Sequence, residues 1–256
     1  MKFLALLFCL LMSISIISAY EVDVDELKNT KKIKFNNWKG RYQRIVPPWR
    51  IRRYGVGMAM RATRVGANIK VPSTYYRFSM VRAISKKEPK KLSADIFSIS
   101  KKSQILHIAY IQEVITGYLM KMYGYSLKDA STLAVFTTYY NAVHRGQIKY
   151  YSTKYKKVVM RHMNKVNAGI ALNYYQWPGK TKIVIPLTKE AKRGKINSID
   201  AFIISDKDTI DKMRKDDKNL KKRKDLISLK DRIIKKKKKE LKRKKERIKR
   251  RETDIK

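Results

Sequence analysis

The chain has 256 residues, enough for one domain and an appendage, and its 62 Lys and Arg against 21 Asp and Glu give a formal net charge of +41. Such a surface attracts polyanions (nucleic acid, anionic lipid, acidic glycan or an acidic protein), although a general lysine bias that only solvates the surface gives the same composition. The one cysteine, Cys9, lies in the N-terminal apolar run, so the chain beyond it has no disulfide, thiolate nucleophile or cysteine-based zinc site.

The N-terminus has the pattern of a secretory signal. Lys2 is followed by an uncharged run, Phe3–Tyr20, with the small residues Ser18 and Ala19 near its end and with Ile17 and Ala19 at the two recognition positions of a cleavage site. We therefore predict export, with residues 1–19 removed by cleavage after Ala19. The run is close to the shortest length that spans a bilayer, about 17 residues, so an uncleaved membrane anchor is the alternative.

A globular body is predicted over residues 20–205. Short strands are expected within residues 31–35 and 37–46, which Pro47 and Pro48 stop. Met58–Val65 follows as a short helix between glycines. Tyr54-Gly55-Val56-Gly57 is no dinucleotide fingerprint, since Met60 stands where the third glycine is needed.

The middle of the body shows helical spacing of its apolar residues. One helix is predicted from a cap at Ser103 to about Tyr123, before Gly124. Ser126 opens a second helix that runs to about His144. A third helix is expected at residues 152–166.

The segment after these helices predicts a turn and a strand. Residues 177–181 (Trp-Pro-Gly-Lys-Thr) invite comparison with a phosphate-binding loop, but Tyr174 stands where the first glycine belongs, and a strand, Lys182–Leu187, follows. The fold class predicted for the body is therefore a compact, mainly α domain with a minor β component.

The tail, residues 206–256, has no Gly, Pro or aromatic residue and can form a helix but no core. Apolar residues recur in it at a spacing of seven, which is half of a coiled-coil seam, while Lys and Arg hold the other half. We expect a long charged helix with partial heptad character that binds a helical protein partner. The candidate helix-association seam comprises Leu220, Ile227, Ile234, Leu241, Ile248 and Ile255.

Catalytic chemistry is not predicted. The three histidines show no metal-binding spacing, and the sparse acids of the body form no close pair suited to acid–base catalysis. We predict no catalytic residue, no cofactor and no metal. The alternative is a hydrolase in which an isolated acid such as Glu113 gains a partner in space; Glu113 is otherwise expected to form an ion pair.

Basic residues interleaved with tyrosines give a candidate polyanion-binding surface. Tyr150, Tyr151 and Tyr155 either stack on a ligand or belong to the core. An export signal removes the chain from cytoplasmic nucleic acid, which leaves anionic lipid, acidic glycan or extracellular nucleic acid. The candidate residues are Lys154, Lys156, Lys157, Arg161 and Lys165 in the third helix and Lys235, Lys236, Lys237, Lys238 and Lys239 in the tail.

Several motifs resemble one known family when they are taken in order. They are residues 95–99 (Asp-Ile-Phe-Ser-Ile), 116–119 (Thr-Gly-Tyr-Leu), 140–146 (Tyr-Asn-Ala-Val-His-Arg-Gly), 167–169 (Asn-Ala-Gly), 175–181 (Tyr-Gln-Trp-Pro-Gly-Lys-Thr) and 185–187 (Ile-Pro-Leu). The chain resembles the amino-terminal domain of the Borrelia 83/100-kilodalton major antigen family over about residues 94–200, and less closely over residues 24–91.

The resemblance implies an exported protein of the spirochaetal cell envelope or periplasm, an antigen without established catalytic residues. It also implies that the seven-residue ladder is a remnant of the family's charged coiled coil. The first hypothesis is therefore a non-enzymatic envelope protein that serves as a structural or interaction module. The second is a polyanion-binding protein that uses the basic third helix and the tail.

Overall fold

The computed structural model describes residues 34–40, 46–205, 225–236, 238–239, 241–243 and 246. The predicted export signal lies outside these residues, as do Leu220, Lys237, Ile248 and Ile255. Helices are α3 (Pro48–Val65), α4 (Ile108–Tyr123), α5 (Leu127–Val143), α6 (Ile148–Lys154) and α7 (Lys157–Met160); strands are β1 (Lys70–Pro72), β2 (Phe78–Ala83), β3 (Ser93–Ile99) and β4 (Lys182–Leu187). The mainly α fold with a minor β component is confirmed.

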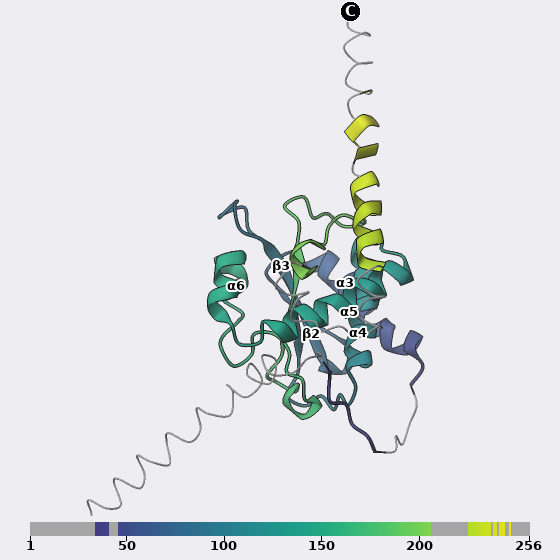
Figure 1. The fold of residues 1–256 in the computed structure, drawn as a ribbon. Coiled ribbons are helices and arrows are strands. Elements are labelled where there is room, and N and C mark those ends of the chain that lie inside the picture. The colour runs from purple at the N-terminus through teal and green to yellow at the C-terminus, as the bar shows by residue number, and fades with distance from the viewer. Residues whose placement is uncertain are drawn as a thin grey trace, which may run out of the picture.

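The four strands form one antiparallel sheet in the order β1-β2-β3-β4. Met80 pairs with Phe97 and Arg82 with Asp95 across the two central strands. Because side chains alternate along a strand, these residues share one face, and Ser79 and Ser98 share the other. Both faces of the central strands are buried, since helices cover one and the α6–α7 segment contacts the other (Figure 1).

Helices α3 and α4 cross on one face of the sheet at two glycines. A Cβ on Gly55 would lie 1.9 Å from the Val114 carbonyl oxygen, and one on Gly117 would lie 2.1 Å from that of Arg52. Only glycine permits this approach, which brings Arg52 within 2.7 Å of Glu113. The expected ion pair of Glu113 is thereby confirmed, with both side chains about three-quarters buried.

Helix α5 closes the outer edge of β4 through one side chain. Asn141 is buried; its amide nitrogen donates to the carbonyl of Val184, and its amide oxygen accepts from the Val184 N–H, both at 2.8 Å. The amide replaces a neighbouring strand at this position, so that the edge of the sheet does not present these groups to another chain.

Some sequence predictions agree with the structure in detail. Ser126 accepts a hydrogen bond from the Asp129 N–H at 3.1 Å and caps α5. Gly124 ends α4 in the left-handed conformation, and strand β4 has the predicted bounds. Each of these signals is local, which is why the sequence alone carries it.

Other predictions are corrected. Helix α3 begins at Pro48, ten residues before the predicted start, and runs through Gly55 and Gly57; Gly55 is needed for the crossing with α4, whereas Gly57 lies on the outer face. Helix α4 begins at Ile108, and Ser103 instead donates to the Arg77 carbonyl at 2.5 Å. Of the strands expected within residues 31–35 and 37–46, residues 31–33 and 41–45 lie outside the described part of the chain, and residues 34–40 contribute an isolated bridge at Asn36. Strands β1, β2 and β3 were not predicted.

Residues 225–236 form a helix that leaves the body beside α5, coloured yellow in Figure 1. Leu226 and Leu229 are buried at 1% and 0% exposure, and Ile233 at 9%. Arg232 pairs with Asp129 of α5, and Lys230 lies 4.7 Å from the centre of the Phe202 ring. Residues 225–236 of the tail therefore form a docked helix. No helix within the described residues has the length and apolar character needed to cross a membrane.

Candidate functional site

The predicted third helix is interrupted, and this interruption builds a site. Tyr155 is extended rather than helical, because it is buried and pairs with Leu92 at the end of the sheet. Helix α6 therefore ends at Lys154 and α7 begins at Lys157. The continuous helix expected at residues 152–166 is wrong, and Lys156 turns inward as a result.

Lys156 lies at the inner wall of a cavity of about 320 Å³. Its side chain is 8% exposed, and the ammonium group donates to the backbone carbonyl of Ser85. The cavity is formed by the β2–β3 loop, the α6–α7 junction and the segment after β4. Its other lining residues are Ile84, Lys86, Pro89, Lys91, Leu92, Ser93, Leu187, Thr188, Lys189 and Ala191.

The charged side chains that line this Lys156 pocket are all positive. Four lysines line it, and no carboxylate is among the described residues that do so. No salt bridge reaches Lys156 from the described part of the chain. A nearly buried ammonium with one carbonyl partner keeps two donors for an incoming group, and burying a charge without a counter-ion is costly. An anion would relieve this cost.

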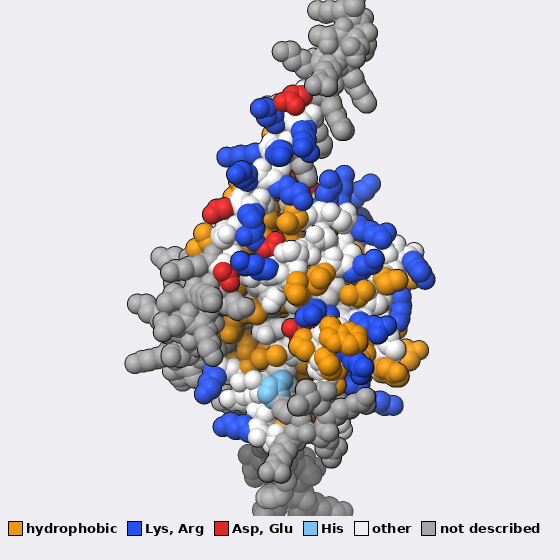
Figure 2. All heavy atoms as spheres, turned by 90° about the vertical axis from the view of Figure 1, so that its right-hand side faces the viewer, with side chains coloured by type: hydrophobic (Ala, Val, Ile, Leu, Met, Phe, Trp, Pro, Cys, Tyr) orange, Lys and Arg blue, Asp and Glu red, His pale blue; other side chains and the backbone are white. Residues whose placement is uncertain are grey.

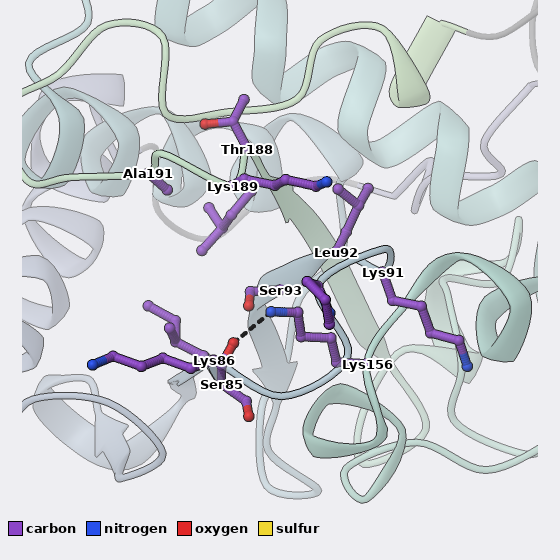
Figure 3. A pocket seen from close by; sticks show the side chains of 12 residues that line it. Ser85, Lys86, Lys91, Leu92, Ser93, Lys156, Thr188, Lys189 and Ala191 are labelled. Carbon is purple, nitrogen blue, oxygen red and sulfur yellow. Dashed lines mark hydrogen bonds between the residues drawn. The ribbon is translucent and has the colours of Figure 1, made fainter.

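Figure 3 shows how the side chains divide around the pocket. The Lys156 ammonium points inward beside Ser85 and Ser93, and Lys189 lies across from it. Lys86 and Lys91 extend away to opposite sides (Figure 3). Lys91 donates to the Ser152 carbonyl at 2.9 Å and so holds the β2–β3 loop against α6.

Glu88 fixes the rim of the pocket from outside. Its carboxylate accepts from the backbone N–H of Lys157 at 2.7 Å and lies 3.5 Å from the Lys91 ammonium. The hydrogen bond from Lys157, and next the charge of Lys91, lower the pKa of Glu88 below its ordinary value. The rim therefore keeps its shape while Glu88 is ionised.

The other predicted polyanion residues are dispersed. Lys154 lies 5.7 Å from the centre of the Tyr150 ring, and Lys157, Arg161 and Lys165 are exposed around α7 and the turn after it. The described tail lysines, at positions 235, 236, 238 and 239, are exposed on the far side of the molecule from α6 (Figure 1). Within the part of the chain that the structure describes, the third helix and the tail thus form no contiguous basic face.

The side of the molecule that Figure 2 presents carries Lys and Arg along the tail helix and scattered over the body among hydrophobic patches. Tyr151 and Tyr155 are fully buried, and Tyr150 stacks on His144 at 3.6 Å between ring centres. The stacking interpretation of Tyr151 and Tyr155 is therefore wrong, since both belong to the core.

The one fully buried acid in the described body belongs to the core. Asp95 accepts from the hydroxyls of Tyr118 and Tyr123 at 2.7 and 2.5 Å, and Arg82 lies 3.4 Å away. Burial raises the pKa of Asp95. Asp95 does not line the Lys156 pocket. Within the described residues, no group of three or more His, Cys, Asp or Glu side chains is placed to hold a metal.

Sequence reasoning found Lys156 but missed the rest of its pocket. Ser85 and Ser93 lie at the two ends of the β2–β3 loop, and Thr188 and Lys189 follow β4 much later in the chain. Strands β2 and β3, which position this loop, were not predicted. Residues 86–91 (Lys-Lys-Glu-Pro-Lys-Lys) have a composition typical of an exposed loop and give no sign of a pocket. The one available signal was the density of lysine near a proline.

Comparison with known proteins gives a family and no nearer relative. The family described as the Borrelia P83/100 protein matches residues 22–256, which is most of the chain. No curated protein and no solved structure matches. Because the match takes in the sheet, the helices and the docked tail, we conclude that the chain belongs to the Borrelia P83/100 protein family.

Proposed function

We propose that this antigen-family protein is a non-enzymatic binding module of the cell envelope, and that the Lys156 pocket takes a carboxylate-bearing sugar of an acidic glycan. The observation that carries the proposal is the nearly buried Lys156 ammonium without a carboxylate partner in the described chain. Membership of the Borrelia P83/100 family supports the envelope setting.

The lining of the pocket favours a sugar over a bare anion. Ser85, Ser93 and Thr188 offer hydroxyl groups that can exchange hydrogen bonds with ring hydroxyls, while Leu92 and Leu187 provide apolar walls. A volume of about 320 Å³ lies at the lower end of small-molecule sites, roughly 300–1,000 Å³, which suits one sugar unit. Lys86, Lys91 and Lys189 would meet the neighbouring acidic units of a polymer.

The test is titration of the full chain with polygalacturonate across a salt series, beside the neutral polymer dextran. We expect binding that survives at about 0.15 M salt, where surface charges are screened within about 8 Å. Lys189→Gln, an exposed lining residue, should weaken binding at least several-fold without changing the melting temperature. Lys154→Gln removes the same charge outside the pocket and serves as the matched control.

Two results would overturn the proposal. One is that polygalacturonate and dextran dissociate from the protein at the same salt concentration. The other is equal weakening by Lys189→Gln and Lys154→Gln, because a loss that depends only on net charge is a general counter-ion effect. Anionic vesicles and DNA that outcompete the glycan would assign the pocket to another polyanion.

Export is part of the same proposal. The uncharged run after Lys2 and the small residues before Glu21 support a signal that is removed after Ala19. Mass spectrometry of the protein from its native envelope should find Tyr20 at the N-terminus. A chain that begins at Met1 or Lys2 would instead support the uncleaved anchor.

A second candidate function is association with a helical protein partner. Ile227, Ile234 and Leu241 follow the spacing of seven and are 42%, 38% and 55% exposed on the tail helix. These side chains do not serve the docking to α5, so they are available for a seam. Ile234→Lys should abolish capture of such a partner while leaving the body's melting temperature unchanged.

A further inference from the structure

The outer side of α3 and the loop between β1 and β2 flank a second hollow, which has a volume of about 600 Å³. Arg53 lines it from α3, and Thr74 and Tyr75 line it from the loop. Gly57 leaves the helix side open, since a Cβ at this position would meet no atom within 4 Å. The hollow shares no described lining residue with the Lys156 pocket, so the two are separate features of the body.

The outer side of α3 carries large apolar side chains among arginines. Trp49, Val56 and Met60 follow helical spacing and share this side, with Trp49 50% and Met60 43% exposed. Arg53 lies between them, and the Arg50 guanidinium lies 5.2 Å from the centre of the Trp49 ring. The packing of α3 against α4 uses the opposite side of the helix, so these side chains are not needed for the core.

The β1–β2 loop adds two tyrosines that point into solvent. Tyr75 and Tyr76 are 74% and 76% exposed, and their φ values of 62° and 52° are ones that bulky residues rarely adopt. Arg61 of α3 fixes the loop by donating to the Pro72 carbonyl at 2.7 Å and to the Thr74 hydroxyl at 3.3 Å. Strain of this kind is common at functional sites, which indicates that the exposed rings serve a contact.

The charged side chains of this region are all positive. The sequence contains no Asp or Glu from Leu27 to Lys87, a stretch that includes both α3 and the β1–β2 loop. Exposed aromatic rings beside arginines suit the boundary of a bilayer, where rings lie at the level of the headgroups and cations attract anionic lipids. Stacking on nucleic acid would use the rings and the arginines, but it would give no role to the aliphatic Met60 and Val56.

We propose that an aromatic surface on α3 and the β1–β2 loop docks on a membrane that contains anionic lipid. The rings and Met60 would enter the boundary between headgroups and acyl chains, and the two arginines would contact the headgroups, as in other proteins that lie on a membrane without crossing it. The proposal does not rest on the function of the Lys156 pocket. The aromatic surface comprises Trp49, Arg50, Arg53, Met60, Tyr75 and Tyr76.

The test is quenching of tryptophan fluorescence in the full chain by vesicles of phosphatidylglycerol and phosphatidylcholine in equal amounts, brominated on their acyl chains. Trp177 is buried, so the lipid can reach only Trp49 and Trp38 among the tryptophans. We expect strong quenching in the natural chain and in Trp38→Phe, and loss of most of it in Trp49→Phe. Brominated phosphatidylcholine alone should quench several-fold less. Binding through the tail or the N-terminal apolar run would not place acyl chains against Trp49.

Tyr75→Asn tests the loop, and Tyr175→Asn is its matched control. Tyr175 is 66% exposed and packs beside Tyr174, outside the hollow. Quenching should fall several-fold in Tyr75→Asn and stay unchanged in Tyr175→Asn. Asn accepts a positive φ more readily than Tyr, so the melting temperature of Tyr75→Asn should stay the same or rise. A purely structural role of Tyr75 would lower it.

Arg53→Gln and Arg161→Gln separate a local charge from the net charge, because both remove one exposed arginine. Quenching should be weaker in Arg53→Gln alone. Equal quenching in the two arginine variants would overturn the proposal, as would quenching that persists in Trp49→Phe. A single-stranded oligonucleotide that quenches Trp49 when the vesicles do not would assign the aromatic surface to nucleic acid instead.

Discussion

Gly117 fixes the distance between α3 and α4, and with it the packing on one face of the sheet. A Cβ at this position would lie 2.1 Å from the Arg52 carbonyl oxygen and 2.8 Å from its carbonyl carbon. The obstacle is backbone, so no side-chain rotation relieves it. The helices would have to separate, which would also lengthen the Arg52–Glu113 ion pair.

Gly117→Ala is therefore expected to lower the free energy of unfolding by about 1–3 kcal/mol, the usual cost of overpacking a core. Gly57→Ala, on the outer face of α3, has no atom within 4 Å of the new Cβ. It should raise the free energy of unfolding by about 0.5–1 kcal/mol, since alanine favours a helix over glycine. Chemical denaturation of both variants checks the pair, and equal effects would contradict the close crossing.

Glu88 gives the rim of the Lys156 pocket a defined response to pH. Because the folded-state pKa of Glu88 is lowered from 4.5, its contribution to stability is present above pH 4.5 and is lost as the pH falls through the folded value. We expect the amide proton shift of Lys157, followed by NMR, to move in that acidic window. In Glu88→Gln the same shift should not titrate, and an unchanged titration would assign it to another group.

The tail helix has one face that docks on the body and another that stays exposed. Leu226, Leu229 and Ile233 follow a spacing of three and four and dock on the body, whereas Ile227, Ile234 and Leu241 follow a spacing of seven and stay exposed. The ion pair between Arg232 and Asp129 adds direction to the docking.

Leu229→Ala should weaken the docking by about 2–5 kcal/mol, as is usual for a fully buried leucine. Trypsin should then cut within residues 225–236 much faster than in the natural chain. Ile234→Ala, which changes an exposed residue of the same helix, should leave the rate unchanged. If both variants were cut alike, the helix would not depend on the body for its protection.

At the scale of the whole molecule, the charge of +41 opposes the compact state. In the described body, close ion pairs offset little of it; Arg52–Glu113 and Arg82–Asp95 are two of them. Most lysines repel one another through solvent, and salt screens that repulsion.

The melting temperature should therefore rise as NaCl is increased from about 0.01 M to 0.5 M, where the Debye length shortens from roughly 30 Å to less than 10 Å. Scanning calorimetry measures this. A flat response to NaCl would mean that self-repulsion is not a major part of the stability.

Local signals could be predicted from the sequence, and long-range ones could not. The Ser126 cap, the Gly124 terminus and strand β4 each depend on a few neighbouring residues. The break at Tyr155 depends on Leu92, more than sixty positions earlier, so helical spacing alone predicted a continuous helix. Strands β2 and β3 are buried on both faces and lack the alternation that marks a half-exposed strand.

The candidate site shows the same difference between local and long-range signals. Lys156 was singled out for its charge, but its burial depends on the break after Lys154. Ser93 and Lys189 lie near each other only because β3 and β4 are neighbours in the sheet, where Ser93 pairs with Leu187. The spacing of seven in the tail could be read from the sequence. The face that docks, with Leu226 and Leu229, could not, because its contacts are with Asp129 and Phe202, which lie far away in the sequence.

The docked tail helix also fixes the angle of rotation between the body and any partner that binds the exposed face of the helix. Residues 225–236 carry both faces on one helix, so a partner on Ile227 and Ile234 would hold the body at one angle. Each residue inserted after Ile233 would turn Ile234 by about 100° and advance it by about 1.5 Å relative to the docked Leu229. The number of residues between the two faces would thus set the orientation of the body relative to the partner. Four inserted residues would nearly restore that orientation, whereas one or two would not.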